Sequence, residues 1–116
     1  MNVLRKPSRP GVFYWKENMI DIKISSNQIT VSGHAGHAPP GHDIVCAAVS
    51  TLVQTLAASI EELTGGRIEH DIQHGSAVIR YKDLTAESKL LIESFFIGVS
   101  GVAESCPECV RVSREA

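Results

Sequence analysis

The sequence is poor in several features that would assign it to a specialised class of proteins. It has three cysteines, 5% aromatic residues and a formal net charge of −2. An odd number of cysteines disfavours a scaffold built on disulfides, and we expect free thiols, as suit a reducing cytoplasm. A chain this close to neutral lacks the positive charge that binds nucleic acids through their phosphates, so we expect no direct nucleic-acid partner.

Long apolar runs are also missing. No uninterrupted run approaches the roughly 20 residues that a membrane-spanning helix needs. Arg5, Lys6 and Arg9 lie near the N-terminus, but no apolar stretch that could act as a signal peptide follows them. We therefore expect a cytoplasmic protein without a membrane partner.

The composition that is present is ordinary for a globular domain. With 116 residues, of which 43% are hydrophobic, the chain is long enough to bury a two-layer core as one domain. Residues 1–18 are basic, contain two prolines and lack a clear periodicity. We expect a flexible N-terminal extension over residues 1–18 and a folded domain over residues 19–116.

The first half of this domain predicts two strands and a helix. Residues 20–24 alternate between isoleucine and polar side chains, which is typical of a half-buried strand, and residues 29–31 form a second strand after a turn. Apolar residues then recur at helical spacing, giving a broad apolar face from Ile44 through Leu63. Gly65-Gly66 is expected to end this helix.

The second half repeats this order. Residues 68–72 and 78–82 predict two strands joined by a turn at His74-Gly75, and Thr85 is placed to cap a second helix. Residues 109–112 look like a last short strand. The order β-β-α-β-β-α-β predicts an α+β fold: two layers, a mainly antiparallel sheet with two helices on one face.

The candidate chemistry lies in a polar loop and the start of the first helix. We expect Asp43 to be the N-cap of that helix, which puts Cys46 at about its third position. Free N–H groups and the positive end of the helix dipole favour a thiolate there. His34 ends the preceding strand and can fold back as a base that also protonates a leaving amine.

Three glycines surround this histidine. Gly33, Gly36 and Gly41 allow a close approach of the backbone and a loop that closes over a substrate, while the helix-start N–H groups suit an oxyanion. The residues alone leave alternatives open, because a cysteine near a helix start is commonly only a small buried residue. Asp43 is also ambiguous, since its carboxylate opposes a thiolate at Cys46 unless it caps the helix or orients His34.

The stretch "GHAGHAPPGHDIVCAAVSTLVQTL", Gly33 to Leu56, resembles the signature of the bacterial ribosomal-processing cysteine protease (Prp) family. The order of strands and helices from Met19 to Val112 is also similar to that family. The resemblance makes His34 the catalytic histidine, Cys46 the nucleophile, and Asp43 and Ser50 supporting residues. It implies a homodimeric endopeptidase without a cofactor. Its substrate would be large-subunit ribosomal protein twenty-seven, from which it removes a short, apolar N-terminal extension during ribosome assembly.

The chain departs from the family pattern at two places in the loop. His37 stands where an aromatic or another residue is common, and Pro39-Pro40 stiffens a segment that we expect to move. These departures put loop flexibility and substrate fit in question, and not the reaction. Residues 1–18 lie outside the resemblance.

Other functions compete with the protease. Cys46 and three loop histidines, with the C-x-x-C pair Cys106 and Cys109, suggest a structural zinc site, although no spacing matches a standard finger. The C-x-x-C pair lies between a helix end and a strand, the reverse of a redox motif, which favours incidental thiols. A ribosome-associated binding protein without activity is a further alternative. We expect His70 and His74 to be solvated residues of a surface hairpin.

Overall fold

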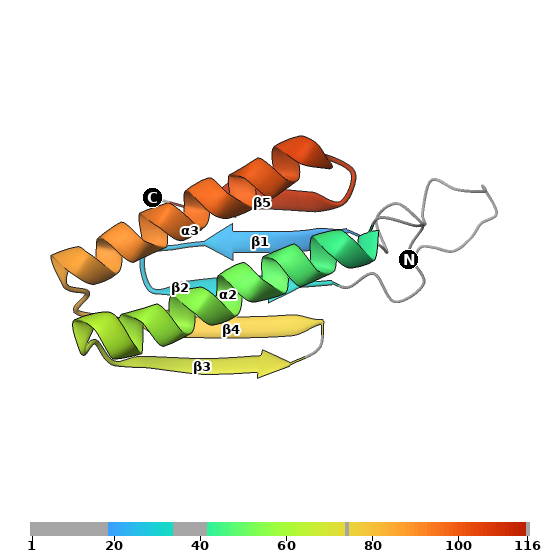
Figure 1. The fold of residues 1–116 in the computed structure, drawn as a ribbon. Coiled ribbons are helices and arrows are strands. Elements are labelled where there is room, and N and C mark those ends of the chain that lie inside the picture. The colour runs from blue at the N-terminus through green and yellow to red at the C-terminus, as the bar shows by residue number, and fades with distance from the viewer. Residues whose placement is uncertain (1–18, 34–41, 74, 116) are drawn as a thin grey trace.

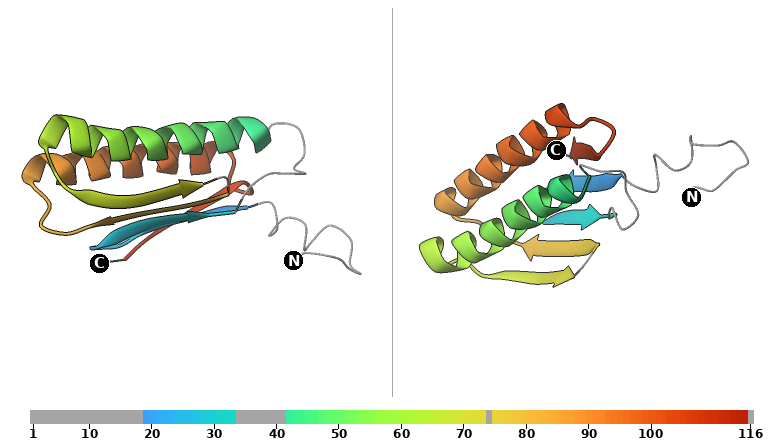
Figure 2. Two further views of the ribbon diagram at one scale, coloured as in Figure 1. Left: turned by 90° about the horizontal axis from the view of Figure 1, so that it is seen from below. Right: turned by 45° about the vertical axis from the view of Figure 1, so that its right-hand side comes forward.

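The computed structural model describes residues 19–33, 42–73 and 75–115 of the chain, without the side chains of His42 and Asp43. The expected N-terminal extension and residues 34–41 of the loop lie outside the described residues. The described part has two layers, a sheet and a pair of helices, seen edge-on in Figure 2.

The sheet has five strands in the order β3-β4-β2-β1-β5. Strands β1 (Ile20–Ile24) and β2 (Gln28–Ser32) form one antiparallel hairpin, and β3 (Ile68–Gln73) and β4 (Ser76–Tyr81) form another. The hairpins join through antiparallel β2 and β4, while β5 (Val110–Arg114) runs parallel to β1 at the sheet edge. The predicted α+β fold with a mainly antiparallel sheet is confirmed.

Two long helices cover one face of this sheet (Figure 1). They are α2 (His42–Thr64) and α3 (Ala86–Ser105). α3 begins as expected, because the Thr85 side chain accepts a hydrogen bond from the Ser88 amide and so caps its first turn. α2 ends before Gly65, whose φ of 68° is the left-handed conformation that glycine adopts at low cost.

The core lies between the two layers. Alternate residues of the strands face the helices, and each helix adds one apolar stripe; the fully buried hydrophobic side chains with the largest volumes are Ile22, Ile29, Ile60, Ile79, Val99 and Cys109. The expected apolar face of α2 is wrong at its two ends. Ile44 and Leu63 are 73% and 75% exposed, because their side chains extend beyond the strip of α2 that the sheet and α3 cover.

α2 also qualifies the expectation about membrane spans. Ile44–Thr64 spans 21 residues and contains an 18-residue window with a mean hydropathy of 1.6, which by length and composition alone is enough to cross a membrane. The helix contains no long uninterrupted apolar run, because Ser, Thr and Gln are spread through it. A core helix has the same properties, and Val53 and Ile60 of α2 are 2% and 0% exposed in the core.

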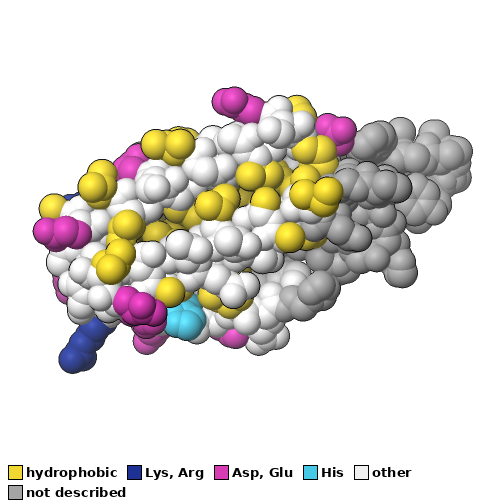
Figure 3. All heavy atoms as spheres, viewed as in Figure 1, with side chains coloured by type: hydrophobic (Ala, Val, Ile, Leu, Met, Phe, Trp, Pro, Cys, Tyr) yellow, Lys and Arg dark blue, Asp and Glu magenta, His cyan; other side chains and the backbone are white. Residues whose placement is uncertain are grey.

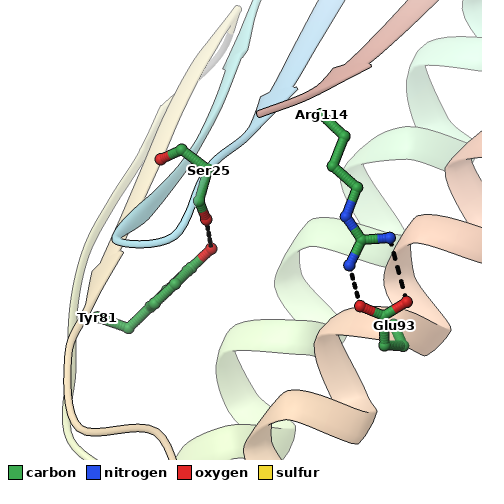
Figure 4. Close-up of polar contacts among 4 residues, drawn as sticks. All are labelled: Ser25, Tyr81, Glu93 and Arg114. Atoms are coloured by element: carbon green, nitrogen blue, oxygen red, sulfur yellow. Dashed lines mark hydrogen bonds and ion pairs between the residues drawn. The ribbon is translucent and has the colours of Figure 1, made fainter. Parts of the chain in front are cut away.

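Two polar contacts join elements at the end of the sheet where β1 turns into β2 (Figure 4). The Tyr81 hydroxyl donates to the Ser25 carbonyl at 2.6 Å, and burial raises the pKa of this phenol from 10.0 while Arg114 opposes the shift. Arg114 pairs with Glu93 of α3 and lies over the Phe96 ring, 4.5 Å from its centre. These contacts tie β4 to the β1–β2 turn and β5 to α3.

Candidate active site

Cys46 lies near the start of α2, as the fifth residue of the helix, and is a free, partly exposed thiol. The sequence predicted it at about the third position, two positions closer to the helix end that exposes free N–H groups. α2 begins at His42, so Asp43 lies inside the first turn and the prediction that it is the N-cap is wrong.

Cys46 opens into a small cavity of about 80 Å³ at one end of the sheet. Ser50, one helical turn later, lines the same cavity, and Gly33 approaches it from the end of β2. The remaining walls are mostly apolar and come from β1, β2, α2 and the β3–β4 hairpin: Ile20, Val31, Val49, Val53, Ile72, Gln73, Gly75, Ser76 and Ala77. The structure therefore brings together three of the predicted site residues from two separate elements.

Gly33 is required where it stands. Its φ is +102°, and a Cβ added to it would lie 2.3 Å from the Met19 carbonyl oxygen. Its amide also donates to the Gly75 carbonyl at 3.1 Å. Any side chain would meet both a strained backbone and a steric clash, so only glycine lets the end of β2 pass between β1 and the β3–β4 hairpin.

The β3–β4 hairpin is the part of the site that sequence reasoning missed. Ile72, Gln73 and Ser76 line the cavity although they are 26 to 30 residues from Cys46 in the chain. The antiparallel register, which pairs Ser32 with Ser76, carries this hairpin to Gly33. No spacing in the sequence signals that contact, because it depends on how the two hairpins pair.

Several predicted site residues lie outside what the structure describes. They are His34, Gly36 and Gly41, together with the side chain of Asp43. Their assignment stays a prediction that rests on the sequence. The same holds for His37 and Pro39-Pro40, and for His74 of the surface hairpin. His70 is exposed, as expected, with its Nε2 atom 3.6 Å from Glu61.

The C-x-x-C pair corrects the expectation of three free thiols. Cys106 and Cys109 form a disulfide, since the turn after α3 brings their Cα atoms to 5.2 Å. Sulfurs joined in this way do not offer the thiolates that a zinc site uses. Among the described residues no group of three or more His, Cys, Asp or Glu side chains is placed to hold a metal ion. The described residues thus give the zinc hypothesis no support, while the side chains of the three loop histidines that it names lie outside them.

Comparison with known proteins points to one family. Residues 19–111 match the model of the family described as cysteine protease Prp. The ribosomal processing cysteine protease Prp of Staphylococcus aureus is 30% identical over 104 residues, which span 82% of this chain and 98% of that protein.

Solved structures agree with this match. The crystal structure of the S. aureus protease Prp in complex with a substrate peptide superposes with a TM-score of 0.74 at 25% identity, covering 84% of this chain and 98% of the other. A second structure of that protease, with a covalently linked product peptide, gives a TM-score of 0.71 at 26% identity, with the same coverage.

Proposed function

The chain belongs to the family of the cysteine protease Prp, and we propose that it is a cysteine endopeptidase whose nucleophile is Cys46 and whose general base is His34. The observation that carries the proposal is the shared cavity of Cys46 and Gly33. Cys46 is the one cysteine of the chain outside the disulfide, and it is partly exposed to that cavity. His34 is the residue that follows Gly33 in the sequence, which supports its assignment as the partner of Cys46.

The reaction uses these two side chains in turn. The Cys46 sulfur attacks the carbonyl carbon of the scissile peptide bond while His34 takes the thiol proton. Collapse of the tetrahedral intermediate breaks the C–N bond, and His34 gives the proton to the leaving amine. A water molecule, deprotonated by His34, then hydrolyses the thioester and frees the new carboxylate. The covalently linked product peptide in the S. aureus protease is consistent with an acyl-enzyme of this kind.

The other predicted residues have supporting roles in this proposal. Asp43 orients His34, a role favoured over capping because α2 starts before Asp43. Ser50 borders the cavity one turn from the nucleophile and contacts the substrate. Gly33, Gly36 and Gly41 allow the loop that holds His34 to close over the peptide and exclude water.

The proposed substrate is a ribosomal protein with an apolar N-terminal extension, large-subunit ribosomal protein twenty-seven. The S. aureus relative carries the name of a ribosomal processing protease. The cavity beside Cys46 is small and mostly apolar, which suits an apolar residue of an extended peptide. We further propose that the enzyme acts in the cytoplasm as a homodimer, without direct contact to nucleic acid or membrane.

The decisive test is cleavage of the extended ribosomal protein from the same cell. The wild-type chain should remove the extension, and Cys46→Ala and His34→Ala should each reduce the rate by a factor of about 10³ or more, because each removes one half of the thiolate–imidazole chemistry. Thr55→Ala on the exposed side of α2 and His70→Ala on β3 serve as matched controls and should keep the wild-type rate. Cleavage that persists in Cys46→Ala would refute the assignment of the nucleophile.

A further inference from the structure

The turn from α3 into β5 lies at the same end of the molecule as the start of α2 (Figure 1). This turn carries the Cys106–Cys109 disulfide, and the start of α2 carries Cys46 of the cavity. Cys106 is the C-cap of α3, and its amide donates to the Val102 carbonyl at 3.0 Å. Cys109 is buried, with 1% of its surface exposed, while Cys106 is partly exposed. The pair thus has one sulfur that a small reagent can approach and one that it cannot.

Backbone contacts lead from this disulfide to the catalytic cavity. The Cys106 carbonyl accepts from the Cys109 amide at 2.9 Å and from the Val110 amide at 3.3 Å, which closes the turn. The Cys109 carbonyl in turn accepts from the Ile20 amide at 2.8 Å. Ile20 lines the cavity with Cys46, and the Met19 carbonyl before it packs against Gly33. The turn closed by the disulfide therefore holds the start of β1, which Gly33 contacts.

The position of the pair on its helix separates it from disulfide-transfer sites. Such sites place the reactive cysteine at a helix N-terminus, where the dipole stabilises a thiolate. Cys106 lies at a C-terminus, where the dipole is of the opposite sign and disfavours the thiolate. A thiol at this position is less ionised than one at a helix N-terminus, so the pair is suited to accept oxidation from a small reagent and not to pass its disulfide to other proteins.

We propose that Cys106 and Cys109 are a reversible redox site that, when oxidised, fixes the catalytic end of the sheet. The oxidant is a low-molecular-weight disulfide, RSSR. The Cys106 thiolate attacks one sulfur of RSSR, which forms a mixed disulfide and releases one RS⁻. The Cys109 thiolate then attacks the Cys106 sulfur, which closes the intramolecular bond and releases the second RS⁻. In sum, two protein thiols are oxidised and RSSR is reduced to two RSH.

The test uses the full chain with Cys46→Ser, so that only this pair can react and no protease activity is needed. Treatment with oxidised glutathione should give, by intact mass, a species two hydrogen atoms lighter and without bound glutathione, and dithiothreitol should reverse it. The oxidised form should melt about 5–10 °C above the reduced form, because the closed bond restricts the unfolded chain. Hydrogen exchange at the Ile20 amide should be slower in the oxidised form.

Cys106→Ser in the same background is the matched control. Its melting temperature and its exchange at Ile20 should not respond to either reagent. A stable glutathione adduct on Cys106 without ring closure, or equal melting and exchange of the two redox forms, would overturn the proposal. If Cys106→Ser does not fold, the melting temperature and the Ile20 exchange of oxidised and reduced Cys46→Ser protein still test the proposal. A failure of the protease assignment leaves these readouts unaffected.

Discussion

Gly33 is the residue at which local backbone geometry and the candidate site meet most directly. It has a positive φ, no room for a Cβ, and a place in the wall of the cavity next to Cys46. For a residue other than glycine, the left-handed backbone and the steric clash would each cost free energy. To relieve the clash, either β1 or the end of β2 would have to move. A small change at Gly33 should therefore alter the cavity before it unfolds the domain.

We predict that Gly33→Ala reduces peptide cleavage strongly, by about a factor of 10² if the site shifts by about 1 Å, and lowers the free energy of unfolding by about 1–3 kcal/mol. Cleavage kinetics and urea denaturation measure the two effects. Gly65→Ala is the matched control, since Gly65 also has a positive φ but an added Cβ meets nothing within 4 Å. It should lose stability and keep its cleavage rate per folded molecule. Equal kinetic defects in both variants would contradict a specific role for Gly33.

Residue identities alone predicted part of this site. Cys46 and Gly33 were singled out because helix starts and glycines have local signatures, Ser50 was singled out by the family resemblance, and the structure places all three around one cavity. The helix start was predicted two residues late, since capping patterns locate helix ends only within a residue or two. The disulfide was missed because only the folded turn after α3 brings Cys106 within reach of Cys109.

Among the elements, the two helices pack closely at one point. A Cβ added to Gly98 of α3 would lie 3.1 Å from Cδ2 of Leu52 on α2. This distance is tighter than an ordinary contact, so a larger residue at Gly98 must push α2 away or turn the Leu52 side chain. Because Cys46 is carried by the same helix, the Gly98–Leu52 contact helps to set the position of the proposed nucleophile relative to α3.

We predict that Gly98→Gln lowers the free energy of unfolding by about 1–3 kcal/mol, as overpacked sites do. Gly101→Gln, one turn later on α3, provides the comparison, because nothing lies within 4 Å of a Cβ added at Gly101. There the better helix propensity of glutamine should raise stability by about 0.5–1 kcal/mol. Chemical denaturation of both variants tests this, and a stabilised Gly98→Gln protein would mean that the helices are not in tight contact.

The sequence predicted the individual strands and helices well, because the patterns that predict them are local. Alternation in β1, helical spacing in α2 and the Thr85 cap of α3 each report on a short segment, and all three elements form as predicted. The strand order is another matter. No single segment carries a sequence signal for the parallel pairing of β5 with β1. The same is true of the approach of the β3–β4 hairpin to Cys46. Both arise when separate segments pack on a common core.

For the whole molecule, the outer surface of the helix layer carries exposed apolar side chains. Figure 3 shows hydrophobic side chains over α2 and α3 on the face turned away from the sheet. Ile44 and Leu63 of α2 and Leu90 and Ile97 of α3 are each 71% to 75% exposed. Where such side chains form a contiguous patch, the surface is one that associates with another protein. This supports the proposed homodimer and suggests that the helix layer forms its interface.

We predict that Ile97→Arg shifts the chain toward monomer and weakens dimerisation at least about tenfold, since it places a charge within an apolar interface. Ser113→Arg adds the same side chain on β5, an exposed position on the opposite face of the sheet, and should leave the association unchanged. Sedimentation equilibrium over a range of protein concentrations measures both. If the wild-type chain is monomeric throughout, the homodimer is wrong. If both variants dissociate alike, the interface lies elsewhere, and the apolar helix surface must then serve a different partner, for which the ribosomal substrate is the first to test.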